Sequence, residues 1–119
     1  MGNNAVAWWE HRVGDLQSAQ KFYGEVFGWK FTSFGEDYVV INGPESEMPI
    51  GALIKDKKEG ARLFAGVEDL EATLAATVAA GGKVVTERTL ISDEFGWYAM
   101  IQDADGHEFG LCTMAPPKS

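Results

Sequence analysis

Cysteine and histidine are scarce in this sequence. Among 119 residues there is one cysteine, Cys112, and there are two histidines, His11 and His107. A lone cysteine excludes an internal disulfide framework and a thiolate cluster for zinc. Two histidines leave few imidazole groups for a metal centre.

The chain also lacks excess positive charge and long apolar runs. It has 10 lysines and arginines against 18 aspartates and glutamates, a net charge of -8. This charge opposes contact with nucleic-acid phosphates or anionic lipid, so neither is an expected partner. No apolar stretch approaches the roughly 20 residues that span a bilayer, and the N-terminus has no signal-peptide pattern. We expect a cytoplasmic protein.

The first half of the sequence predicts one strand, one helix and three further strands. Residues 5–13 are rich in β-formers. In residues 16–27 apolar side chains recur at spacings of three and four, which is typical of an amphipathic helix, with Asp15 as N-cap and Gly28 as stop. Three short strands are then expected at residues 29–33, 38–42 and 50–54.

The second half repeats this order. A strand at residues 62–67 precedes an alanine-rich helix at residues 70–80, with Asp69 in the capping position and Gly81-Gly82 after its end. Strands follow at residues 83–89, 96–102 and 107–113, the last two joined by a turn at 103–106.

A shift of 54 positions supports a duplication. It places Val13, Asp15, Leu16, Gly28 and Thr32 on Val67, Asp69, Leu70, Gly82 and Thr86. We therefore expect a single domain, residues 1–119, made of module 1 at about 5–54 and module 2 at about 62–113.

Several segments carry a family resemblance. Residues 12–16 (RVGDL) and 27–31 (FGWKF), then 67–70 (VEDL) and 103–106 (DADG, with Ala104 where a proline is usual), resemble the vicinal oxygen chelate superfamily of glyoxalases, bleomycin resistance proteins and dioxygenases. This resemblance implies an α+β fold of two tandem βαβββ modules. Their curved mixed sheet would surround a central cup, with the helices outside, and members commonly form homodimers.

Strand alternation predicts which side chains face this cup. Trp8, Glu10 and Arg12 share one face of the first strand, whereas Trp9 and His11 share the other. In the fifth strand Arg62 and Phe64 share a face, and Leu63, Ala65 and Val67 form an apolar face suited to a helix.

The resemblance also implies a divalent metal with one ligand from each of four strands, at positions that match Trp8, Gly51, Arg62 and Gly110. None of these residue types is an ordinary metal ligand, so we expect a member of the family that has no metal site and no cofactor. Glu10 and Glu108 lie two residues from such positions. They could hold a hard ion weakly, but pairing with Arg12 or Arg62 is the favoured interpretation.

Without a metal, the expected cup is lined by aromatic and guanidinium groups. The predicted ligand-binding residues are Trp8, Arg12, Arg62, Phe64 and Trp97, with Trp29, Tyr38 or Tyr98 as further aromatic surface. Such a wall suits a flat or carboxylated small molecule held by stacking and forked hydrogen bonds. Which of Trp97 and Tyr98 faces the cup is left open.

Three functional classes remain open. The first is metal-independent binding of a small organic ligand. The second is a lyase or isomerase, related to lactoylglutathione lyase, with Glu10 or Glu108 as general base and an arginine stabilising negative charge. The third is a protein-interaction module with a vestigial cup. A homodimer is expected by analogy, with Trp9 and Phe34 as candidate surface aromatics.

Overall fold

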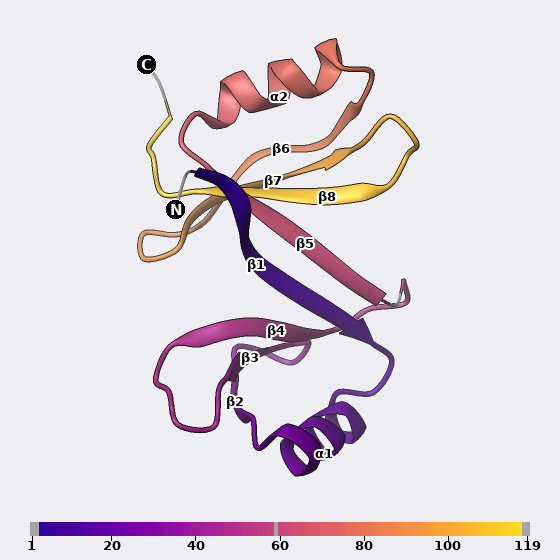
Figure 1. The fold of residues 1–119 in the computed structure, drawn as a ribbon, viewed down its shortest axis with the longest axis vertical. Coiled ribbons are helices and arrows are strands. Elements are labelled where there is room, and N and C mark those ends of the chain that lie inside the picture. The colour runs from indigo at the N-terminus through magenta and orange to yellow at the C-terminus, as the bar shows by residue number, and fades with distance from the viewer. Residues whose placement is uncertain (1–2, 59, 118–119) are drawn as a thin grey trace. The chain divides into compact units, whose positions relative to one another are not determined.

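The computed structural model describes residues 3–58 and 60–117, and Figure 1 shows their strands and helices. The elements follow in the order β1 (Asn3–Val13), α1 (Leu16–Phe27), β2 (Lys30–Ser33), β3 (Tyr38–Asn42), β4 (Pro49–Lys55), β5 (Gly60–Val67), α2 (Leu70–Ala79), β6 (Lys83–Ser92), β7 (Gly96–Gln102) and β8 (Glu108–Thr113). This is the predicted βαβββ order, twice. The α+β fold class is confirmed.

The strands are ordered β2-β3-β4-β1-β5-β8-β7-β6 in a mixed sheet. Parallel pairs join β1 to β4 and β5 to β8, and antiparallel pairs join β2 to β3, β3 to β4, β6 to β7 and β7 to β8. Each module thus closes its βαβββ unit by returning its last strand beside its first, in parallel. The central cup implied by the resemblance stays a prediction.

Local signals placed both helices as expected. The Asp15 carboxylate accepts a hydrogen bond from the Ser18 backbone N–H at 3.1 Å, and the Asp69 carboxylate accepts one from the Ala72 N–H at 3.0 Å. These bonds satisfy amide groups that have no partner inside the helix. Helix α1 ends at Gly28, whose φ of 71° is the left-handed cap that glycine adopts without strain.

The strand ends differ from the sequence prediction by a few residues. β6 continues to Ser92 instead of Thr89, and it pairs with β7 through three register shifts. Such register shifts break the hydrophobic alternation by which a strand is recognised, and for this reason the predicted strand ended three residues before the observed one. The turn before β8 is confirmed, because the Asp103 Oδ1 accepts hydrogen bonds from the N–H groups of Asp105 and His107.

The described residues group into two compact units. One unit is Trp8–Arg62, and the other combines the beginning of β1, as far as Ala7, with the chain from Leu63 onward. Both β1 and β5 contribute residues to each unit. The predicted single domain with two modules remains a prediction.

Each unit has its own apolar cluster. In the first unit the cluster is built on Val39, Ile41 and Leu53, with aromatic side chains from β1, α1 and the start of β2 around it. In the second unit it is built on Val67, Leu70, Leu74, Ala99 and Leu111. Among the described residues, no helix is long and apolar enough to cross a membrane.

Candidate ligand-binding face of the first strand

The two faces of β1 have different surroundings. Trp9 packs against the apolar cluster beside α1, and the His11 Nε2 lies 3.3 Å from the Tyr23 hydroxyl of that helix. Glu10 and Arg12, which alternate with these two residues, are buried on the opposite face. Strand parity, on which the predicted site depends, is therefore confirmed for β1.

Glu10 is the centre of a hydrogen-bonded network on that opposite face. Its Oε1 accepts hydrogen bonds from Arg62 Nη2 at 2.7 Å and Arg62 Nε at 3.0 Å. Its Oε2 accepts one from the Tyr38 hydroxyl at 3.1 Å. The pairing of Glu10 with an arginine, favoured from the sequence, is thus confirmed, and the residue is only 6% exposed.

Trp8 and Tyr38 extend this network. The indole Nε1–H of Trp8 donates to the Tyr38 oxygen at 3.2 Å, so the hydroxyl accepts from the indole and donates to the carboxylate. Burial raises the pKa of Tyr38 above its ordinary value, and the negative charge of Glu10 adds to that effect. Tyr38 is therefore held neutral as a donor to Glu10. We call Trp8, Glu10, Tyr38 and Arg62 the Glu10 network.

Arg12 lies two residues further along the same face. Its Nε donates to the Gly60 carbonyl at 3.2 Å, at the first residue of β5, and the residue is 7% exposed. The first unit therefore has two guanidinium groups close to Glu10 in the sequence or by contact, Arg12 on β1 and Arg62 on β5. Both charges act on the Asp56 carboxylate: its pKa is lowered first by the hydrogen bond from the Lys58 backbone N–H and further by Arg12 and Arg62.

The other predicted site residues lie in the second unit. The Phe64 ring covers Gly110, so that a Cβ added at Gly110 would overlap it. Phe64 and Gly110 are register partners between β5 and β8, and Glu108 begins β8, opposite Gln102 of β7. Ala65 and Val67, which alternate with Phe64, pack against the α2 cluster, as predicted.

The position of Gly51 corrects one expectation. A Cβ at Gly51 would run into the Trp9 indole, and Gly51 is paired with the buried Ile41, so it belongs to the face that α1 covers. The residue beside Glu10 in the β1–β4 register is Ala52. The sequence comparison was one residue out of register, because the loop before β4 left its alignment unanchored.

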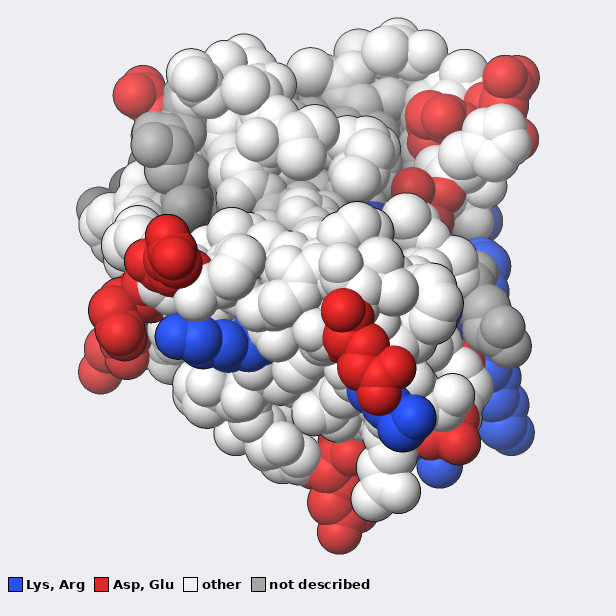
Figure 2. Space-filling model, turned by 60° about the horizontal axis from the view of Figure 1, so that its bottom comes forward, with Lys and Arg blue, Asp and Glu red and all other residues white. Residues whose placement is uncertain are grey.

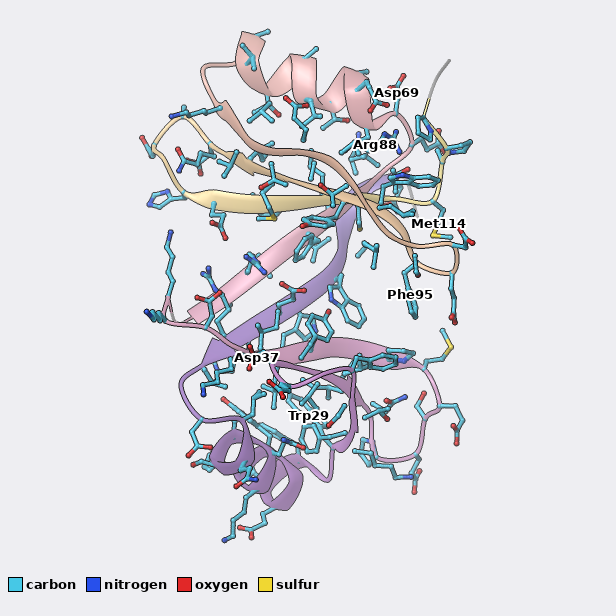
Figure 3. The ribbon with its side chains drawn as sticks, turned by 180° about the vertical axis from the view of Figure 1, so that it is seen from behind. Trp29, Asp37, Asp69, Arg88, Phe95 and Met114 are labelled. Carbon is cyan, nitrogen blue, oxygen red and sulfur yellow. The ribbon has the colours of Figure 1, made fainter. Side chains whose placement is uncertain are left out.

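Three aromatic expectations are also corrected. Trp29 stacks on Tyr23 with ring centroids 5.5 Å apart, under α1 rather than on the Glu10 face (Figure 3). Trp9, a candidate for a dimer surface, is packed in the same cluster. Trp97 packs against the α2 cluster. The Arg88 guanidinium carbon lies over the Trp97 ring, 5.2 Å from its centroid. Its neighbour Tyr98 alternates to the other face of β7.

The residues at the family's metal positions do not fit a metal. With the corrected register they are Trp8, Ala52, Arg62 and Gly110, which offer no ordinary ligand atom. Arg62 is moreover engaged with Glu10. Among residues 3–58 and 60–117 no cluster of three or more histidine, cysteine, aspartate or glutamate side chains could hold an ion.

The sequence pattern did not predict the hydrogen bonds of Tyr38 within this face. Tyr38 was considered only as possible aromatic surface, whereas its hydroxyl connects Trp8 to Glu10. Tyr38 is the first residue of β3. It pairs with Ile54 of β4, which in turn pairs with Arg12 of β1, so strand register places Tyr38 on the same side as Arg12. That register could not be fixed from the sequence.

Comparison with protein families identifies the class of this fold. Residues 5–111 match the family described as the Glyoxalase/Bleomycin resistance protein/Dioxygenase superfamily. The match covers most of the chain, in agreement with the duplicated βαβββ order. The chain belongs to this superfamily.

Two relatives are similar over most of their length. A protein named "Probable lactoylglutathione lyase" from Vibrio parahaemolyticus serotype O3:K6 is 32% identical over 129 residues, covering 93% of this chain and 91% of the relative. A "Glyoxylase-like domain-containing protein" from Didymella fabae is 26% identical over 109 residues, covering 83% and 85%.

Solved structures share the fold. The Mn(II)-bound glyoxalase from Novosphingobium aromaticivorans has a TM-score of 0.75 at 17% identity, covering 98% of this chain and 42% of that one. An extradiol dioxygenase from B. fuscum has 0.72 at 18%, covering 96% and 33%. Methylmalonyl-CoA epimerase from Mycobacterium tuberculosis has 0.66 at 20%, covering 98% and 93%. The chain thus spans less than half of the first two structures, and at these identities the likeness concerns the fold alone.

Proposed function

We propose that this protein binds a small organic ligand, aromatic or carboxylated, on the β1 face that carries Trp8, Glu10 and Arg12, without a resident divalent metal. The observation that carries the proposal is the Glu10 network. In this network a buried carboxylate is bonded on both oxygens by protein donors, Arg62 on one and Tyr38 on the other.

The cost of such a network supports a functional interpretation. Removing a carboxylate and a guanidinium from water is expensive, and apolar residues of similar volume often serve stability as well or better. Trp8 and Tyr38 place polar groups beside the charged Glu10 and Arg62. A few polar groups at fixed positions among aromatic rings are typical of a small-molecule site and unusual in an apolar core. Indole and phenol faces suit a flat ligand, and guanidinium groups suit its carboxylate.

Within this proposal the four side chains have separate functions. Glu10 fixes the orientation of the Arg62 guanidinium through Nε and Nη2, and Tyr38 fixes the other oxygen of the carboxylate. The hydrogen bond from the Trp8 indole N–H to the Tyr38 oxygen fixes the orientation of the indole ring before a ligand binds. Preorganisation of this kind lowers the entropy lost on binding.

Tryptophan fluorescence tests the proposal directly. Titration with aromatic carboxylates should quench the protein, and the Trp8→Phe variant should lose most of that quenching. Trp9→Phe is the matched control, because Trp9 is on the opposite face of the same strand. The amide analogues of the same compounds should bind about tenfold or more weakly if a guanidinium recognises the carboxylate.

A metal test uses the same titration. Binding should survive treatment with a chelator, and the melting temperature should not rise with nickel, zinc or manganese at low micromolar concentration. Ligand binding that requires one of these ions would overturn the metal-independent proposal. Absence of binding by every compound class would instead favour the interaction-module alternative.

A lyase or isomerase is the second candidate function, favoured by the similarity to the Vibrio protein named as a probable lactoylglutathione lyase. Glu10 or Glu108 would act as general base, with an arginine stabilising the negative charge that develops on the substrate. Glu10→Gln and Glu108→Gln separate the carboxylates: one substitution should abolish turnover while leaving substrate affinity. Full rates in both variants would contradict this mechanism.

The cellular setting is also part of the proposal. A cytoplasmic location and a homodimer are inferred from composition and from the superfamily, and Phe34, which is exposed, remains a candidate contact. Fractionation of the expressing cells and sedimentation of the purified protein check these two points.

A further inference from the structure

We infer that the end of the β6–β7 hairpin is a docking surface for a basic amphipathic helix of another protein. We define this hairpin end by its exposed side chains, which are Leu90, Ile91, Asp93, Glu94, Phe95 and Met114. All six belong to the second unit, whereas the Glu10 network belongs to the first. The inference is therefore independent of the proposed ligand site.

Large apolar side chains are exposed together at the hairpin end. The exposed fractions are 54% for Leu90, 49% for Ile91, 50% for Phe95 and 47% for Met114. Leu90 pairs with Trp97 across the hairpin. Gly96, which follows Phe95, is covered by Met114, since a Cβ added at Gly96 would lie 2.9 Å from the Met114 Sδ (Figure 3). The exposed apolar area is on the order of 300 Å², a size at which surface patches are often functional.

Strand β6 is poorly suited to accept an added strand. It comes last in the strand order, so one of its edges has no neighbouring strand among the described residues. Its pairing with β7 is interrupted by three register shifts, one of them between Leu90 and Ser92. Such irregular steps protect a sheet edge, because a second strand cannot follow them in register. A partner therefore contacts the hairpin end through side chains, as the apolar stripe of an amphipathic helix does.

Acidic side chains border this apolar surface. Asp93 and Glu94 form the tip of the hairpin and are exposed. None of the ion pairs between described residues includes either carboxylate. Residues 89–117 contain no lysine or arginine, and Arg88, which precedes them, is bonded to Glu71 through Nε and Nη2. The hairpin end thus leaves negative charge for a partner to neutralise.

The equivalent hairpin of the first unit has a different charge balance. Its β2–β3 turn also carries an exposed phenylalanine, Phe34, followed by Glu36 and Asp37. There, however, Lys55 and Lys57 line the same hollow as Asp37, with a volume of about 300 Å³. Figure 2, which brings the α1 end of this unit forward, shows basic side chains beside acidic ones in several places. An aromatic ring with two acidic residues is therefore offset by lysines in the first hairpin and not in the second.

These charges decide which partner fits the hairpin end. A second copy of the chain has a net charge of -8 and carries the same acidic tip, so it is repelled. Anionic lipid and nucleic acid are repelled for the same reason. A basic amphipathic helix fits, because its apolar stripe covers Ile91 and Phe95 while lysines beside that stripe reach Asp93 and Glu94. The small area predicts a weak complex, with a dissociation constant on the order of micromolar.

Fluorescence anisotropy with labelled synthetic peptides tests the inference on the full chain. The probe is a helix of about 15 residues with leucine at helical spacing on one face and lysine on the other. It should bind at low salt and at least about threefold more weakly near 0.5 M salt. A peptide with glutamate for each lysine should not bind, and one with glutamine for each leucine should bind about tenfold more weakly. Equal binding of either comparison peptide would overturn the inference.

Neutralising each hairpin in turn locates the site. Asp93→Asn with Glu94→Gln should weaken binding of the lysine–leucine peptide by about fivefold at low salt and reduce its salt dependence. Glu36→Gln with Asp37→Asn is the matched control, because it removes the same charge from the first hairpin and should leave binding unchanged. Equal losses in the two variants would mean that the peptide responds to net charge alone, and the inference would be wrong.

Apolar substitutions test the other half of the surface. Ile91→Thr with Phe95→Ser should weaken peptide binding about tenfold, whereas Phe34→Ser in the first hairpin should not change it. All three side chains are exposed, so circular dichroism and melting temperature should remain those of the wild type. Unchanged affinity in the first variant would refute the docking surface. Sedimentation velocity adds a last check: self-association that this variant abolishes would assign the surface to a second copy instead.

Discussion

The two βαβββ halves share an order of elements and differ in what fills the space beneath their helices. Helix α1 packs through aromatic rings, since those of Tyr23, Phe27 and Trp29 all contact one another with centroids 4.9 to 6.0 Å apart, and it buries none of its residues completely. Helix α2 buries Leu70 and Leu74 among aliphatic side chains. The same topology is therefore stabilised by two unlike apolar clusters, which shows that the order of elements does not require a particular core composition.

The halves differ in their ion pairs as well. In the compact unit Trp8–Arg62, Glu10 of β1 and Arg62 of β5 pair in buried surroundings, whereas in the other unit Glu71 and Arg88 pair near solvent, beside Asp69 at the start of α2 (Figure 3). The hydrogen bond from Arg88 lowers the pKa of Glu71. A solvated pair contributes little to stability, and a buried pair is costly to break. The buried pair is the one with a candidate functional position.

The largest expected effect comes from the aliphatic core of the second half. Leu70→Ala removes a side chain with no exposed area and should lower the free energy of unfolding by about 3 kcal/mol, through lost burial and a cavity. Leu16→Ala at the matching position of α1 should cost about half as much, because Leu16 is only partly buried. Denaturant titration measures both. Equal losses would contradict the contrast between the two helices.

The buried ion pair should give the next largest effect. Glu10→Gln keeps the shape of the side chain but leaves the Arg62 guanidinium beside a neutral amide, at a cost of about 2 kcal/mol in unfolding free energy. Glu71→Gln, which neutralises the solvated pair of the second half, should cost under about 1 kcal/mol. The comparison fails if the two variants are equally stable.

Tyr38→Phe should cost about 1 kcal/mol, because Glu10 loses a donor and Trp8 loses an acceptor. Its pH dependence is the sharper test. Since the pKa of Tyr38 is raised above its ordinary 10.0, the unfolded chain ionises first, and wild-type stability should fall as pH rises above that value. The variant should lack this part of the alkaline loss. Parallel curves for both proteins up to the alkaline limit would argue against a buried Tyr38 donor.

Helix capping should give the smallest and most similar effects in the two halves. Asp15→Ala and Asp69→Ala each remove a side-chain acceptor from a first-turn N–H and should cost about 1 kcal/mol. Thermal unfolding of the two variants checks whether the two N-caps contribute equally to the free energy of unfolding. Asp15→Asn, which retains a capping oxygen, should recover most of the stability.

Much of the fold was predictable from local patterns. The bounds of α1, the strand Tyr38–Asn42 and the strand Gly96–Gln102 follow from periodicity, caps and turn residues, each of which acts within a few positions of the chain. The faces of β1 followed from alternation in the same way. Errors appeared where a strand is irregular, as in β6, or where a loop separates it from its reference point, as before β4.

The candidate site was only partly predictable. Glu10 was expected to meet an arginine, but the choice of Arg62, which is 52 positions away, and the contribution of Tyr38, which is 28 away, depend on strand pairing. Trp29 and Trp97 show the converse. As aromatic residues they were expected to line the ligand site. Instead, Trp29 packs against the α1 cluster and Trp97 against the α2 cluster.

The sequence by itself determined the order of the helices and strands, where both helices begin, which side chains of β1 share a face, and the resemblance to the superfamily. Those properties depend on residues close together along the chain. Tertiary structure alone decided that Ala52 rather than Gly51 lies beside Glu10, and that one carboxylate is bound by both a guanidinium and a phenol. Register between distant strands is a property of the whole sheet, because a slip of one residue exchanges its two faces.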